Sequence, residues 1–414
     1  MAYQRSGGLR RGSNLPRVAD FNGSVVLDAV RRSGTGVSRA ELTGATGLAA
    51  QTVSDICQRL LGQGLIAETG TTSTGLGRPR RTLELVPSSR YALGIHIDPA
   101  TITYVLLDLV GDVVARIRQE ARGSEPDRIL DTMSRTLDEL VESSGADRSR
   151  IVGLGIASPG PIDVERGIVV DPPLLPGWHR VRLRDRLREA TGLPVLIDKD
   201  VTAAAVAERW AGAAVGSSNF VFVYLGTGVG AGFVVDDVVA RGHSGNAGDV
   251  GHVITDVDGP PCDCGQRGCF GAACSPLTLI REATAAGVLT PSREPDDPVA
   301  AVRRVKDLCR AADAGDDRAL AVLHRYAQRL ARAIENIASL LDVDLVVVGG
   351  PVWAPAARHF LPILESRVDQ GFVMRDIHGV RAVGTTVGED VAAIGAACLV
   401  LDSTFAARPS LLLT

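Results

Sequence analysis

The chain has 414 residues, of which 45% are hydrophobic and 22% are charged, and its formal net charge is −4. This length exceeds what one hydrophobic core holds, so we expect two or three domains. No apolar run approaches the roughly 20 residues of a membrane-spanning helix, and no apolar segment follows the basic residues near the start, which argues against a membrane protein and a secretory signal. We therefore expect a cytoplasmic protein, in which a tight Cys/His cluster indicates a metal site before a disulfide.

Charge is distributed unevenly along the chain. Residues 1–86 contain eleven arginines, no lysine and six acidic residues, which is a surplus of five positive charges and leaves −9 for the remainder. A basic N-terminal segment on an acidic body indicates a nucleic-acid-binding module joined to a second function.

Residues 1–86 have the pattern of a helix-turn-helix domain. Apolar spacing from Pro16 to Val30 predicts one helix, and Ser38 with Glu41 predicts a capping box that opens a short second helix. A recognition helix is predicted from about Ala50 to Leu61, although Ala49 lacks a capping side chain. Its outward polar face suits base edges and phosphates, and the predicted contacts to a double-stranded DNA operator are Gln51, Thr52, Asp55, Gln58 and Arg59.

A β-wing is predicted after the recognition helix. The stretch "LIAE" begins a strand, a Gly/Thr-rich tip follows, and a second strand alternates Leu83 and Leu85. Arginines beside such a tip suit phosphates or a narrow minor groove, so we predict DNA contacts by Arg78, Arg80 and Arg81. A three-helix module that binds protein is the alternative. A palindromic operator needs two recognition helices about one DNA turn apart, so we expect a homodimer or homotetramer.

From residue 87 onward the pattern is α/β. A strand–turn–strand–turn–strand unit begins at Tyr91, and a similar unit with the glycine-rich turn "LGTGVGAG" begins at Asn219. This duplication predicts two similar lobes with a cleft between them, which we place at 87–209 and 210–388. A closing helix is predicted over 389–405.

One Gly/Pro-rich loop, from Gly248 to Ser275, holds four of the seven cysteines, in the stretch "GDVGHVITDVDGPPCDCGQRGCFGAACS". An imidazole and three thiolates make a closed tetrahedral set that suits a structural Zn²⁺. The predicted metal ligands are His252, Cys262, Cys264 and Cys269, with Cys274 left over. The alternative is four reduced side chains that bind no metal.

The winged helix, "LGTGVGAG", "GNAGDVGH" and "CDCGQRGC" together resemble the ROK family of repressors, open reading frames and kinases, and the similarity covers nearly the whole chain. The resemblance implies the duplicated ribonuclease-H-like fold of sugar kinases, hsp70 and actin, with zinc on the same four residues. It implies that the closing helix packs on the first lobe and that His252 also contacts the sugar. Members with an N-terminal winged helix are sugar-responsive repressors, whereas members without it are often sugar kinases.

Against the family's kinases, the first turn of this chain departs at each diagnostic position. Those kinases carry Asp-x-Gly-Gly-Thr where this chain has "HIDPA", His96 to Ala100. Asp98 repels phosphate and Pro99 has no N–H to offer. The glycine turn at 226–230 and Asp200, which matches the family's catalytic base, remain. We therefore predict a catalytically dead cleft and no enzyme activity; an ATP-dependent sugar kinase with a regulatory DNA-binding head is the alternative.

The family's sugar contacts map onto six positions, and three of them depart from the family pattern. Lys199 stands where Asn is usual, Asp249 where Glu is usual, and Gly271 where Glu is usual. The predicted ligand-binding residues are Gly160, Lys199, Asp200, Asp249 and His252.

The departure at Lys199 leaves two interpretations open. Lys199 binds an acidic sugar or a sugar phosphate, or it pairs internally with Asp198, Asp200 or Asp249. The second interpretation leaves a degenerate pocket and a ligand-independent regulator. The leading hypothesis is a repressor of sugar uptake or catabolism genes that is controlled by a sugar or sugar-derivative effector.

Overall fold

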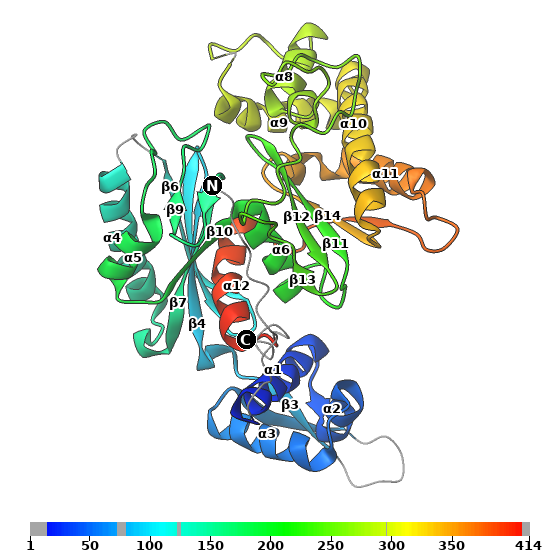
Figure 1. Cartoon of the computed structure of the whole chain (residues 1–414). Helices are drawn as coiled ribbons and strands as arrows, with labels where there is room; N and C mark the ends of the chain where they lie inside the picture. The colour runs from blue at the N-terminus through cyan, green and yellow to red at the C-terminus, as the bar shows by residue number, and fades with distance from the viewer. Residues whose placement is uncertain (1–14, 73–79, 122–125, 295, 408–414) are drawn as a thin grey trace, which may run out of the picture. The chain divides into compact units, whose positions relative to one another are not determined.

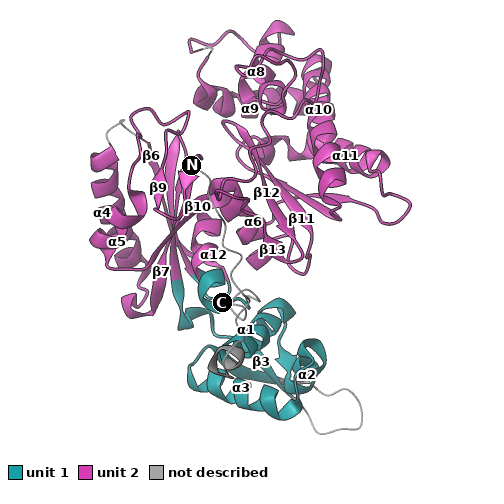
Figure 2. Cartoon of the chain, viewed as in Figure 1, with its two compact units in different colours: residues 1–91, 108–110, 401–414 teal, residues 92–107, 111–400 magenta. Residues whose placement is uncertain are grey.

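The computed structural model describes residues 15–72, 80–121, 126–294 and 296–407, in two compact units (Figure 2). The first unit comprises residues 1–91, 108–110 and 401–414, and the second comprises 92–107 and 111–400. None of the helices in these described ranges is long and apolar enough to cross a membrane.

The first unit contains three helices and a small antiparallel sheet. The helices are α1 (Leu15–Ser33), α2 (Arg39–Thr46) and α3 (Ala50–Gly62). The strands are β1 (Val37–Ser38), β2 (Ile66–Thr72) and β3 (Arg80–Leu85), in the order β1-β3-β2. The two-residue strand β1 has no sequence signal of its own, because it forms only by pairing with β3.

The ends of the helices follow the predicted local chemistry. The Glu41 backbone N–H donates to Ser38 Oγ at 3.3 Å and the Ser38 N–H donates to Glu41 Oε2 at 2.8 Å, so the capping box is confirmed. Gly47 ends α2 in the left-handed conformation, with φ of 68°. Helix α3 begins after Ala49 without a side-chain cap and buries Val53, Ile56 and Leu60.

The first lobe of the second unit is built on a five-stranded sheet with strand order β10-β7-β4-β5-β6. Helices α4 (Pro126–Ser144) and α5 (Leu183–Thr191) lie on one face of this sheet (Figure 1). A hairpin of β8 (Ile162–Asp163) and β9 (Ile168–Val169) follows β7. The sheet strands are β4 (Tyr91–Ile97), β5 (Thr101–Asp108), β6 (Val113–Glu120), β7 (Ile151–Ser158) and β10 (Val195–Lys199).

The second lobe repeats this strand arrangement, with the order β13-β12-β11-β14-β15. In both sheets the first three strands in the chain are neighbours in order. The fourth strand pairs with the first, and the fifth pairs with the fourth. The duplicated two-lobe α/β prediction is therefore confirmed. The strands are β11 (Phe220–Leu225), β12 (Val229–Val235), β13 (Val238–Val239), β14 (Leu345–Gly349) and β15 (Arg381–Gly384).

Helices form most of the remainder of the second lobe. Tyr326 of α10 stacks on Phe360 of α11 with ring centroids 5.1 Å apart, inside the core of this lobe. No element was predicted between the Cys/His loop, residues 248–275, and strand β14. Helices α8, α9 and α10 were therefore not foreseen from the sequence. The helices are α6 (Asp200–Ala211), α7 (Phe270–Ala273), α8 (Pro276–Ala285), α9 (Pro298–Asp313), α10 (Asp317–Leu341) and α11 (Trp353–Gly371).

The closing helix α12 (Val391–Phe405) lies against the sheet of the first lobe, on the face opposite α4 (Figure 1). A Cβ atom at Gly155 of β7 would collide with the carbonyl oxygen of Ala396, and one at Gly395 would collide with that of Ala203 on α6. Both glycines are therefore required for the close approach of α12 to its neighbours.

Candidate functional site

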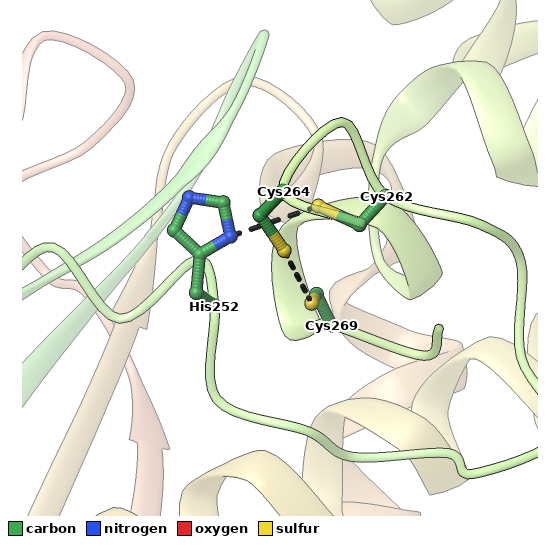
Figure 3. A group of neighbouring side chains, drawn as sticks. All are labelled: His252, Cys262, Cys264 and Cys269. Carbon is green, nitrogen blue, oxygen red and sulfur yellow. Dashed lines mark hydrogen bonds between the residues drawn. The ribbon is translucent and has the colours of Figure 1, made fainter. Parts of the chain in front are cut away.

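The four predicted metal ligands come together in one cluster (Figure 3). One ligand atom from each of His252, Cys262, Cys264 and Cys269 lies within 4.8 Å of every other. Cys262 Sγ is 3.6 Å from His252 Nδ1, and Cys264 Sγ is 3.6 Å from Cys269 Sγ. Residues between positions 252 and 269 of one loop thus form one compact group.

These separations match a tetrahedral ion. Metal–sulfur bonds of about 2.3 Å and metal–nitrogen bonds of about 2.0 Å place two sulfurs about 3.8 Å apart, and sulfur and nitrogen about 3.5 Å apart. The side chains therefore stand at the corners of a site that could hold a metal ion. With Nδ1 turned to the cluster, the His252 Nε2 atom points away from it (Figure 3).

The backbone of the loop holds the cluster in shape. The Cys262 N–H donates to the Gln266 carbonyl at 2.8 Å and closes the turn between the cysteines. Gly268 has φ of 66°, and a Cβ atom there would collide with the Asp256 carbonyl oxygen. Arg329 of α10 donates to Asp256 at 3.1 Å and to Glu282 at 2.5 Å, which ties the loop to the helical core.

The thiols of the cluster cannot all ionise easily without a cation among them. Burial and the neighbouring thiols raise the pKa of Cys269 to about 11. The backbone hydrogen bond at Gln266 lowers the pKa of Cys264. Cys274 lies outside the cluster, and burial raises the pKa of its thiol, so it is inert, as expected of the spare cysteine.

The predicted ligand-binding residues gather where β10 meets α6. Lys199 ends β10 and Asp200 begins α6. Lys199 is buried, and its Cε atom lies 3.2 Å from the place where a Cβ atom at Gly160 would be. Burial raises the pKa of Asp200, an effect that the nearby His96 opposes.

The other two predicted ligand residues lie on the loop that leads into the metal cluster. Asp249 and His252 are both exposed. The Gly271 N–H donates to the carbonyl of Gly251 at 2.8 Å, so the glycine that replaces the family's Glu lies beside His252.

Two residues that were not predicted contact this group of side chains. The Asn246 side chain accepts from the Ile162 N–H and donates to the Ile162 carbonyl, both at 2.8 Å. The Asn246 backbone carbonyl accepts from Lys199 Nζ at 3.3 Å. Arg241 Nε donates to Asp198 Oδ2 at 2.7 Å. No local sequence pattern marks these residues, because their partners lie far away along the chain.

The turn between β4 and β5, residues 98–101, uses its own backbone N–H groups. The Asp98 and Thr101 N–H groups donate to each other's carbonyl oxygens at 3.1 and 3.2 Å. The Ala100 N–H donates to Asp98 Oδ1 at 2.9 Å. Pro99 has no N–H. The three backbone N–H groups of this turn, here called the first-strand turn, are therefore already hydrogen-bonded. The turn offers an incoming phosphate a carboxylate and no unpaired N–H group.

A cavity of about 220 Å³ lies beside the first-strand turn. The Tyr224 ring packs against Gly226, the first residue of the glycine-rich turn at 226–230. Arg118 holds Asp390 through two hydrogen bonds of 2.8 and 2.7 Å, and Arg116 adds a third at 2.7 Å. The charged residues that line the cavity are Asp98, Arg118, Arg303, Glu389 and Asp390.

The outward face of α3 carries the predicted DNA contacts. Gln51, Asp55, Gln58 and Arg59 are exposed and Thr52 is half-buried. Gln51 Nε2 donates to Asp55 Oδ1 at 2.8 Å, so these two side chains lie along one helix face. The Arg59 guanidinium lies close to Gly23 of α1.

The wing arginines are described only in part. Arg78 lies outside the described residues, and so does the side chain of Arg80. Arg81 pairs with Glu68, which Arg39 also contacts at 3.0 Å. These two arginines lower the pKa of Glu68. Two guanidinium groups around one carboxylate leave a net positive charge beside strands β2 and β3.

A model of the ROK family matches residues 92–403 of the chain. A glucokinase of Halalkalibacterium halodurans is 31% identical over 319 residues, which are 76% of this chain and 96% of the relative. A putative xylose repressor of Caldicellulosiruptor sp. is 27% identical over 399 residues, which are 95% of this chain and 98% of the relative.

Among solved structures, a ROK family transcriptional regulator, a homolog of the E. coli MLC protein, superposes with a TM-score of 0.74 at 24% identity. The match covers 96% of this chain and 98% of that chain, and at this identity it demonstrates a shared fold. The regulator and repressor matches thus extend over nearly the whole chain, whereas the glucokinase match covers about the length of the two lobes.

Proposed function

The chain belongs to the ROK family, and from this premise we propose that it is a DNA-binding transcriptional repressor whose two-lobed body binds a sugar or sugar-derivative effector. The observation that carries the proposal is the first unit: the capped helix α2, the helix α3 with its polar outward face, and the antiparallel strands β2 and β3 precede the body in the chain. The putative xylose repressor aligns over 95% of this chain, which includes most of that unit.

In this proposal α3 lies in the major groove of an operator. Gln51, Thr52, Asp55, Gln58 and Arg59 face the base edges and phosphates, and Arg78, Arg80 and Arg81 of the wing contact the backbone or the minor groove. The positive surplus of five charges in residues 1–86 supports this assignment. Two copies of the chain would present two recognition helices to a palindrome.

We assign a structural Zn²⁺ to His252, Cys262, Cys264 and Cys269. Four protein ligands leave no open position for water or substrate, so the ion would hold the loop in its fold. The loop also carries Asp249 and His252 of the ligand subsite. The metal would therefore fix the orientation of His252, whose Nε2 atom remains available to a ligand (Figure 3).

The ligand subsite in this proposal consists of Gly160, Lys199, Asp200, Asp249 and His252. A ligand that bridges the two lobes there would favour one arrangement of the lobes over another, and so shift the equilibrium between DNA-binding states.

A sugar kinase is the second candidate, because a glucokinase relative is 31% identical over the lobes. Phosphoryl transfer requires donors around the phosphates, and the first-strand turn uses its N–H groups internally while Asp98 faces the cavity. A coupled assay with ATP and glucose or xylose separates the candidates: we expect no turnover above the background, and sugar-dependent turnover would favour the kinase.

The proposal is tested by fluorescence anisotropy of the full chain with DNA from its own upstream region, against a scrambled duplex. We expect selective binding, and Gln58→Ala should weaken it by roughly 1–3 kcal/mol at the upstream duplex. The exposed Gln328→Ala on α10 is the matched control and should bind like the unaltered chain. Equal, salt-sensitive binding to both duplexes would contradict the proposal.

A further inference from the structure

The two lysines of the chain differ sharply in environment. Lys199 is 8% exposed, whereas Lys306 of α9 is exposed. An ammonium group has three N–H donors and a full charge, and its burial is costly unless partners replace the water that it loses. The contacts of Lys199 Nζ therefore indicate what the site is built to receive.

Among the described residues the ammonium has one hydrogen-bond partner, a neutral carbonyl, while the carboxylates of Asp198 and Asp200 lie close enough to interact with its charge. The Asn246 carbonyl accepts from Nζ at 3.3 Å, and no described carboxylate forms an ion pair with it. Asp198 is already paired with Arg241 at 2.7 Å and accepts the Lys199 backbone N–H at 3.0 Å. Asp200 accepts the Val201 N–H at 2.7 Å. The alternative interpretation required a close ion pair between Lys199 and Asp198, Asp200 or Asp249. No such pair is present among the described residues.

The residues around Lys199 are in partial contact with solvent. Gly160, Asp200 and Asn246 around the ammonium arm are half-buried, and Asp249 and His252 are exposed. Gly160 has no side chain to cover Lys199. A Cβ atom at Gly160 would lie 3.2 Å from Lys199 Cε. Lys199 is thus a buried side chain beside polar residues that are themselves in contact with solvent.

We propose that the effector is an anionic sugar derivative whose carboxylate or phosphate binds the Lys199 ammonium while one of its hydroxyl groups hydrogen-bonds to Asp200. A charge-assisted hydrogen bond to a buried ammonium is stronger than one from a neutral hydroxyl. A neutral sugar brings no carboxylate or phosphate to form a close ion pair with the ammonium, so the site discriminates against it. This inference rests on the proposed function, because it names the chemical class of the effector at the same subsite.

Because the chain has only two lysines, lysine-selective ¹³C labelling gives two side-chain NMR signals, and Lys306 serves as the internal reference. The probes are D-glucuronate and glucose 6-phosphate, compared with glucose and xylose. We expect one of the two anions to shift the Lys199 signal and leave Lys306 in place; which of them does so identifies the anionic group. In calorimetry that anion should bind at least tenfold more tightly than either neutral sugar.

Variants separate the charge of Lys199 from its packing. Lys199→Met should weaken binding of the anion at least tenfold, Lys199→Arg should retain most of it, and Lys306→Met should leave it unchanged. Thermal unfolding of each variant checks that the fold is intact. Binding of neutral sugars as tight as that of the anions, no binding of either anion, or full binding by Lys199→Met would each overturn the inference.

The same samples are tested for DNA binding, which keeps the two failures apart. Selective DNA binding without any response at Lys199 would overturn the effector class and leave the repressor proposal in place. Anion binding at Lys199 without selective DNA binding would support the effector class and overturn the repressor proposal.

Discussion

The Cys/His loop, residues 248–275, and the cavity beside the first-strand turn are assembled by different means. The Cys/His loop gathers its ligands from residues close in sequence, and its turn hydrogen bond joins Cys262 to Gln266. The cavity beside the first-strand turn is walled by residues far apart in the chain, such as Arg118 and Asp390. A local motif can therefore be recognised from spacing alone, whereas a site that depends on distant pairs has to be seen in the fold.

Cys264→Ser should break the Cys/His loop most severely, because it removes one of four ligands. We expect metal affinity to fall by at least about 100-fold, with loss of the ion from the purified protein. Elemental analysis and a chelator titration measure this. Cys274→Ala is the matched control, since Cys274 lies outside the cluster; an equal loss of metal in that variant would show that the ligand set is wrong.

Gly268→Ala tests whether the backbone of the loop, and not only its ligands, defines the site. The new Cβ atom would collide with the Asp256 carbonyl at a residue with φ of 66°. We expect a loss of roughly 2–3 kcal/mol in stability and weaker metal binding. Gly265→Ala, at φ of 87° with open space around it, is the control for backbone strain alone. If the two variants unfold at the same temperature, contact with Asp256 is not what constrains the loop.

Asp390→Asn tests the distant pairs around the cavity. The buried Asp390 carboxylate would no longer balance Arg116 and Arg118, whose side chains are 50% and 43% exposed. Because water partly solvates these arginines, we expect a loss of roughly 1–3 kcal/mol, measured by denaturant unfolding. Glu389→Gln, at a more exposed carboxylate 3.8 Å from Arg118, is the control and should cost less. A similar cost for both would contradict the assignment of the main pair.

A substitution at Glu208 should have the smallest effect on folding stability. It tests how a buried carboxylate that is held by distant partners makes stability depend on pH. Its buried carboxylate accepts from the Ala213 N–H at 2.7 Å and from the Thr385 hydroxyl, and burial raises its pKa. A raised folded-state pKa contributes stability that is present below the unfolded-state value and is lost as pH rises through the folded-state value.

Glu208→Gln removes this titration; its one amide oxygen can still accept from the Ala213 N–H, and its NH₂ group can donate to the Thr385 hydroxyl oxygen. The variant should therefore lose less stability than the unaltered chain as pH rises above the ordinary glutamate range, in unfolding curves recorded across pH. Parallel curves for the two proteins would show that Glu208 does not titrate with unfolding.

The local chemistry of the chain could be predicted well. The capping box at Ser38, the inward face of α3, the repeated three-strand unit and the four-residue Cys/His cluster each depend on patterns within one segment. The amphipathic pattern of α10, with Val322, Tyr326 and Leu330 buried on one side, was equally available in the sequence but was not used.

The contacts that decide the ligand subsite could not be predicted from the sequence. Lys199 was expected either to bind an anion or to pair with a nearby acid, and the choice depends on Arg241 and Asn246, more than forty residues away. Tertiary folding brings Asp198 to Arg241 and leaves the ammonium with a backbone carbonyl. No periodicity or motif in the sequence predicts that Asp198 pairs with Arg241 and that Lys199 contacts the Asn246 carbonyl.

The most direct test of the repressor assignment is selection of bound duplexes from a random library by the full chain, followed by sequencing. The account predicts an enriched inverted repeat whose half-site centres are about 10 bp apart, or a multiple of that, because two copies of α3 would read successive major grooves on one face of the DNA. Recovery of duplexes with no shared motif would contradict the assignment of the first unit as a sequence-specific DNA-binding domain.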